Sequence, residues 1–242
     1  MTDKLDKLYE EFFRENSIDN KSGIVQGTNR RFATKIAIGD NYKSSQTKLL
    51  FVSLDMGKDE CFKENRFQNY EERKNNALNE DLSKKNPHMA GVYGTALYFL
   101  KNQNEWENEW VKFSQSNKFF REAIKDNIDV LPKNVLSHIS LINFYNFVTV
   151  GRVERTGGND RNFINPQSEI ELLINTINTI KPNIIIVQSK TKTLKDYFLN
   201  HIKPEISYDL DIYIGYHPSV FGRGIKYRNP KLYIENLKKG KI

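Results

Sequence analysis

Four short apolar runs recur along the chain, each with the length and the branched or aromatic side chains of a buried parallel strand. They cover residues 48–54, 136–144, 183–188 and 211–216. Amphipathic helical patterns lie before and between them. Strands that alternate with helices predict an α/β fold with helices on both faces of the sheet. We therefore expect a three-layer α/β/α sandwich with a central four-stranded parallel sheet.

The clearest helical pattern covers residues 166–180, and weaker ones cover 193–202 and the N-terminal residues. In the first, apolar side chains recur at i, i+3, i+4 and i+7 from Ile170 onward, which is the spacing of one helix face. Asn165 supplies an N-cap, and the Lys-Pro sequence at 181–182 ends the helix. We expect these apolar faces to pack on the sheet.

The chain has 242 residues, 38% of them hydrophobic, which is enough for one α/β domain to bury a continuous core. We expect a single domain over residues 1–242, with a polar insertion at about 58–86, where Asn, Lys and Glu dominate. The formal charge of +7 favours contact with a polyanion such as DNA, because clustered cations release counterions from phosphates.

Cys61 is the only cysteine, which excludes an internal disulfide and argues against a cysteine-ligated zinc or iron-sulfur site. The chain begins with polar residues, and no apolar run is long enough to span a bilayer. We expect a cytoplasmic monomer that makes no membrane contact and uses ordinary side chains rather than a metal or cofactor.

Three of the four strands lead into residues that carry chemistry. Residues 55–57, directly after the first strand, read Asp-Met-Gly and place a carboxylate on a tight turn. The second strand ends at Asn143, and the fourth is followed by His-Pro-Ser at 217–219. Parallel strands end at one shared edge of a sheet, where ligands bind. Asp and Asn are also common in ordinary turns, so the order and spacing of the motifs carry the argument.

These motifs, in this order, resemble those of the uracil-DNA glycosylase superfamily. The turn at 55–57 is similar to its water-activating motif, the segment around Asn143 to its base-reading strand end, and residues 217–219 to its His-Pro-Ser motif. The resemblance covers most of the core from Leu49 to Arg223. It implies a uracil-DNA glycosylase-like fold and a DNA glycosylase that flips out a base and hydrolyses its N-glycosidic bond.

The resemblance also implies roles for single residues. Asp55 would position or deprotonate a water, His217 would donate to O2 of the departing base, and Asn143 would read the base edge. The residues implied to line the base pocket are Leu54, Met56, Gly57, Tyr93, Phe144 and His88, the last as an alternative to Tyr93 for stacking. Those implied to contact DNA are Ser189, Ser219, the apolar wedge Phe221, Arg223, Lys226 and Arg228.

Gly57 stands where the classical uracil enzymes carry a Tyr whose ring excludes bulk at C5 of the base. Without that side chain we expect a uracil-like or C5-modified pyrimidine as substrate, such as the modified bases of some phage genomes. The enzyme would then serve antiviral defence rather than DNA repair. The alternatives are a non-catalytic nucleic-acid-binding module with a glycosylase-like pocket, and a flavodoxin-like nucleotide-binding protein, for which a glycine-rich phosphate loop is missing.

Overall fold

The structure is a computed structural model that describes residues 1–32, 35–54, 92, 95–96, 98–100, 135–149, 162–217 and 230–242. Within these ranges it forms an α/β fold, as the sequence predicts. None of the helices in the described part of the chain is long and apolar enough to cross a membrane.

The main sheet has five strands in the order β2-β4-β3-β6-β7. Their bounds are Ala37–Ile38 (β2), Leu49–Ser53 (β3), Ile139–Asn143 (β4), Ile184–Val187 (β6) and Asp211–Ile214 (β7). The last four are parallel to one another, whereas β2 is an outer strand that pairs antiparallel with β4. The four predicted strands are therefore found, and β2 makes the sheet mixed rather than purely parallel.

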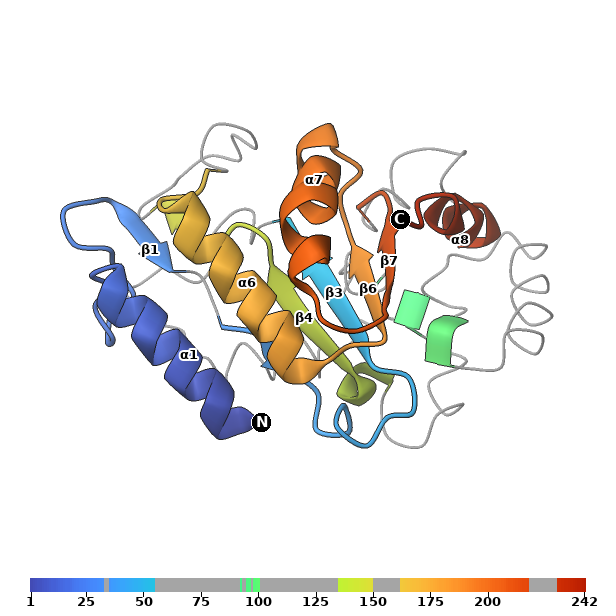
Figure 1. Ribbon diagram of the computed structural model, residues 1–242, viewed down its shortest axis with the longest axis horizontal. Helices are drawn as coiled ribbons and strands as arrows, with labels where there is room; N and C mark the ends of the chain where they lie inside the picture. Colours follow the sequence, from blue (N-terminus) through green and yellow to red (C-terminus); the bar gives the residue numbers. More distant parts are fainter. Residues whose placement is uncertain are drawn as a thin grey trace.

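Both faces of the sheet are covered, because successive side chains of each strand point to opposite sides. On β3, Leu49 and Phe51 pack with α8 (Pro230–Lys238) and with the helical residues among 92–100. Leu50 and Val52 pack on the other side with α6 (Pro166–Ile180) and α7 (Lys192–Tyr197). Figure 1 shows α6 and α7 lying across one face of the sheet, with α8 beyond β7. Every residue of β3 is buried, as expected of a central strand.

The helix α6 begins and ends where the sequence predicts. The side chain of Asn165 accepts a hydrogen bond from the backbone N–H of Ser168, and Pro166 occupies the first turn. Lys181 ends the helix in the left-handed region at φ 47°, with its N–H donating to the Ile177 carbonyl. The second predicted helix is divided. Its first part is α7, and residues Phe198–Ile202 continue as a π-helical turn before a 3₁₀ turn at Lys203–Glu205.

Beside the main sheet, the helix α1 (Thr2–Glu15) packs against a two-stranded antiparallel sheet. Its strands are β1 (Arg30–Phe32) and β5 (Phe147–Thr149). Phe13 and Phe32 meet edge to face with ring centroids 4.8 Å apart, and Phe32 meets Phe147 at 5.6 Å. Figure 1 shows α1 beside α6, and Leu5 of α1 joins the core cluster that contains Leu50 and Val52 of β3.

Candidate active site

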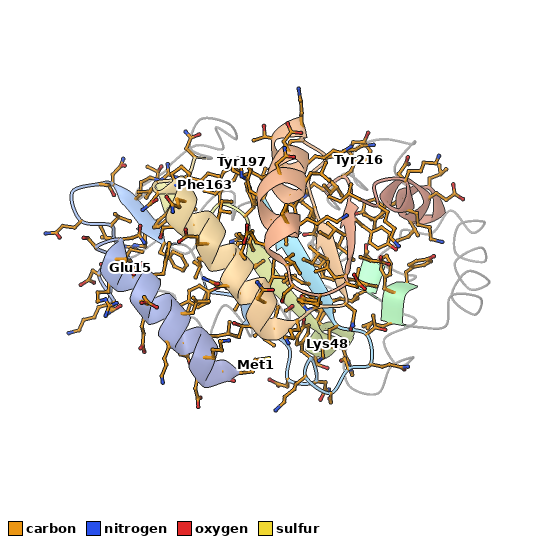
Figure 2. All side chains as sticks on the ribbon, viewed as in Figure 1. Met1, Glu15, Lys48, Phe163, Tyr197 and Tyr216 are labelled. Atoms are coloured by element: carbon orange, nitrogen blue, oxygen red, sulfur yellow. The ribbon has the colours of Figure 1, made fainter. Side chains whose placement is uncertain are left out.

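The carboxyl ends of the four parallel strands meet at one edge of the main sheet. A 3₁₀ turn at Val135–His138 leads into β4 at the opposite edge, where His138 Nδ1 lies 2.8 Å from Ser45 Oγ. Figure 2 separates the two edges, with Lys48 just before β3 and Tyr216 just after β7. Among the predicted catalytic residues, Asn143 ends β4 and His217 follows β7, so the structure brings them to the same edge.

Three polar side chains form a row across this edge. Asn143 of β4 is the register partner of Ser53 of β3. On the other side of β3, Val52 pairs with Val187, which sets Ser53 opposite Gln188. Ser53 Oγ donates to Gln188 Oε1 at 2.9 Å, and both side chains are buried. In-register residues of parallel strands share a face, so the row Asn143–Ser53–Gln188 lies on the face of the sheet that packs with α8 and with the helical residues among 92–100.

Asn143 carries the most informative polar group in the row. The residue is only 7% exposed, and its Nδ2 has no hydrogen-bond partner among the residues that the structure describes. A buried amide usually has all its polar atoms bonded, because an unpaired donor loses its bonds to water. The structure therefore leaves Asn143 with a buried, unpaired donor at the carboxyl edge of the sheet.

The end of β7 is held by α8. The hydroxyl of Tyr233 donates to the Tyr216 carbonyl at 3.0 Å, and Gly215 N–H donates to the Val187 carbonyl at 2.9 Å. At Gly215 a Cβ atom would come within 2.5 Å of Leu237 Cδ1, so glycine lets α8 pack closely here. These contacts fix the backbone one residue before His217, which is partly buried.

A positively charged side chain, that of Lys190, also lies at this edge. Lys190 Nζ sits 5.2 Å from the centroid of the Tyr216 ring, within the range of a cation–π contact. Neither Lys190 nor the pairing of Ser53 with Gln188 can be predicted from the sequence pattern. The pair depends on strand register between residues 135 positions apart, and a register is visible only once the strand order is known.

Phe144 and Asn143 point to opposite faces of the sheet. The Phe144 ring is 1% exposed and packs in the core on the α6 and α7 side, with ring centroids 5.2 Å from Phe163 and 5.6 Å from Tyr197. Leu54 is partly buried against the same core. Ser189, the phosphate-contacting candidate after β6, is 8% exposed.

The other predicted site residues lie outside the described residues, and so does the insertion at 58–86. They are Asp55, Met56, Gly57, His88, Tyr93, Ser219, Phe221, Arg223, Lys226 and Arg228. Within the described ranges, no group of three or more His, Cys, Asp or Glu side chains is arranged to hold a metal ion.

A buried carboxylate, that of Glu169, lies near the turn that follows Asn143. Glu169, in the first turn of α6, is 1% exposed, and its Oε1 accepts from the backbone N–H groups of Ile164 at 2.6 Å and Asn165 at 3.1 Å. Burial raises the pKa of Glu169 to about 7, although these backbone donors, the N–H of Asn146 and the charge of Arg30 pull it down. Glu169 thus links the start of α6 to the turn that follows Asn143.

Comparison with known proteins gives no match: no family model, no curated protein and no solved structure matches this chain.

Proposed function

We propose that this protein is a DNA glycosylase that flips a uracil-like or C5-modified pyrimidine out of DNA, hydrolyses its N-glycosidic bond and leaves an abasic site. The proposal includes a uracil-DNA glycosylase-like core in which β4, β3, β6 and β7 form the central parallel sheet. The parallel pairing of those four strands supports it, because the strands that lead into the sequence motifs at 55–57, 143 and 217–219 then all end at one edge.

The observation that carries the proposal is the buried side-chain N–H₂ group of Asn143, which has no hydrogen-bond partner among the described residues. A pyrimidine presents donors and acceptors along its Watson–Crick edge, and an Asn side chain offers one of each. The Nδ2 group, buried and without a partner among the described residues, is a donor held ready for a carbonyl such as O4 of uracil.

The bond-breaking step needs charge stabilisation at both ends. As the base leaves, positive charge builds on the sugar and negative charge on the base, as in other oxocarbenium-like displacements. Asp55 accepts a proton from the attacking water while the water oxygen bonds to C1′. The electron pair of the broken C–N bond passes to the base, whose O2 is stabilised by a hydrogen bond from His217.

The DNA must be opened before this step, because the glycosidic bond is hidden in a duplex. Extrusion of a nucleotide costs about a few kcal/mol, which phosphate contacts and an inserted side chain offset. We assign the wedge to Phe221 and stacking on the base to Tyr93, with His88 as the alternative. The phosphate contacts are assigned to Ser189, Ser219, Arg223, Lys226 and Arg228.

The substrate class follows from Gly57. Without a side chain two residues after Asp55, the pocket wall beside C5 is withdrawn, so a substituent at C5 is accepted. Hydroxymethylated or glycosylated pyrimidines, which some phage genomes carry, fit this description. An enzyme that removes them acts in antiviral defence, in the cytoplasm, and plain uracil would instead indicate DNA repair.

The test is a profile of base release. Matched oligonucleotides carry uracil, thymine opposite guanine, a 5-hydroxymethyl pyrimidine or its glucosylated form, and abasic sites are measured by alkaline cleavage. We expect release of at least one of these bases, with the C5-modified ones preferred. The Asn143→Ala variant should lose that release. Asn183→Ala removes an amide at the opposite edge of the sheet, where it accepts from Lys48 N–H at 2.8 Å, and should retain it.

Two results would contradict the proposal. Binding of these oligonucleotides without release of any base would indicate the non-catalytic nucleic-acid-binding module instead. Equal release by the wild-type chain and the Asn143→Ala variant would remove Asn143 from the site.

A further inference from the structure

The carboxyl end of β3 is held from both sides. On the β4 side, the backbone N–H groups of Phe144 and Tyr145 donate to the carbonyls of Ser53 at 2.7 Å and Leu54 at 2.9 Å. On the β6 side, the last backbone bond runs from Gln188 N–H to the Val52 carbonyl at 2.9 Å. Beyond that point, the side-chain bond from Ser53 to Gln188 continues the link between the two strands.

This side-chain bond is buried and central. Gln188 is 1% exposed and Ser53 is 7% exposed, so water does not compete strongly for their hydrogen bond. Ser53 stands between Gln188 and Asn143 in the register row, and it lies two residues before Asp55. The end of β3 is thus joined to the end of β6 by a buried hydrogen bond between a hydroxyl group and an amide.

From this arrangement we propose that Ser53 and Gln188 form a positioning pair, whose side-chain hydrogen bond fixes the end of β3 relative to Asn143. The inference rests on the proposed function. Neither side chain is required to touch the base. The pair acts by positioning Asp55, which activates the water that attacks C1′ of the sugar, relative to Asn143, which binds the edge of the base. A misplacement of about 1 Å at such a site can lower a rate about 100-fold.

The test compares Ser53→Ala with Ser140→Ala in the full chain. Both serines are buried in the same sheet and donate a hydrogen bond, since Ser140 Oγ donates to the Leu49 carbonyl at 3.1 Å, but Ser140 lies toward the amino end of β4. On the base that the wild-type chain releases best, we expect Ser53→Ala to lower the single-turnover rate about 100-fold, with DNA affinity within about two-fold. Ser140→Ala should keep the rate.

Three further variants separate positioning from stability. Ser53→Thr keeps the hydroxyl and should restore most of the rate. Gln188→Met keeps the length but removes the acceptor, and should reproduce Ser53→Ala. The double variant should be no slower than the slower single one, because both changes remove the same bond. If Ser53→Ala does not fold, Gln188→Met carries the test, with folding checked by circular dichroism.

The outcomes are distinguishable. Base release by the wild-type chain, together with Ser53→Ala and Gln188→Met variants that are as fast as Ser140→Ala, would overturn the positioning pair and leave the proposed function intact. Independent, multiplicative effects of the two changes would overturn it as well. A wild-type chain that releases no base would overturn both proposals.

Discussion

The charge of Glu169 gives a stability prediction that does not depend on the proposed function. The carboxylate is buried, and its Oε2 makes no hydrogen bond in the described part of the structure. Burial raises its pKa from 4.5 to about 7. Below pH 4.5 the side chain is neutral in both the folded and the unfolded chain, so it imposes no electrostatic cost there.

As the pH rises from 4.5 to about 7, the unfolded chain loses this proton while the folded chain keeps it. Folding then takes up a proton, and the free energy of unfolding falls by about 1.4 kcal/mol per pH unit. Above about pH 7 the full cost is reached, on the order of 3 kcal/mol.

The perturbation is Glu169→Gln, which removes the titrating group. Its carbonyl can still accept from Ile164 and Asn165, but the new amide N–H₂ takes the place of the unbonded Oε2 and costs about 1–3 kcal/mol at every pH. That constant offset cancels when two pH values are compared. Relative to wild type, the variant should therefore gain about 3 kcal/mol between about pH 5 and about pH 8, within a factor of two.

The assay is urea denaturation of both proteins at the two pH values, with unfolding monitored by circular dichroism. Glu171→Gln is the matched control, because Glu171 lies on the same helix but is exposed. It should show a much smaller change. If the difference in unfolding free energy between wild type and Glu169→Gln is the same at both pH values, the argument from burial of this carboxylate is wrong.

Three further changes have defined outcomes. Gly240→Ala should lower the melting temperature, by the equivalent of about 1–3 kcal/mol of overpacking, because a Cβ there would meet the Ile214 carbonyl oxygen at 2.0 Å; an unchanged melting curve would contradict this. Arg223→Ala should reduce the salt dependence of DNA binding by about one in log-log slope, whereas binding independent of salt would refute a phosphate-contacting loop. Gly57→Tyr should abolish release of bulky C5-modified bases while sparing uracil, and equal loss of both would refute the open pocket.

The parts of the fold that could be predicted from the sequence are those with local signals. The helix α6 has a cap, a periodic apolar face and a Lys-Pro stop, and it begins and ends at the predicted residues. The strands β3, β6 and β7 are apolar runs flanked by polar residues, and each was predicted within two residues of its bounds.

The missing parts lack such signals. The strands β1, β2 and β5 have only two or three residues each, too few for a periodicity, and are stabilised by pairing with distant segments. The predicted start of β4 is a 3₁₀ turn instead, where Asn41 N–H donates to the Ser137 carbonyl. The helix α8 packs on the same side of the sheet as the polar row, and the sequence pattern does not predict it.

In the candidate site, too, some features can be predicted from the sequence and others depend on how distant strands pair. That Asn143 and His217 share an edge follows from topology alone, because Asn143 ends one parallel strand and His217 follows another. The hydrogen bond between Ser53 and Gln188 does not follow from topology alone, since it requires the register of β3 against β6. The core position of Phe144 is also a matter of register, because one residue along a strand reverses the face.

The central claim is the proposal that Asp55 acts as the general base in the hydrolysis of a glycosidic bond. The most direct test measures the single-turnover rate of base release by wild type and Asp55→Asn, on the best substrate of the base-release profile, together with the Kd for the same DNA. We predict a rate at least about 100-fold lower for the variant, because a general base typically contributes that much or more, with the Kd within about two-fold. An Asp55→Asn variant that releases the base at the wild-type rate would contradict the account.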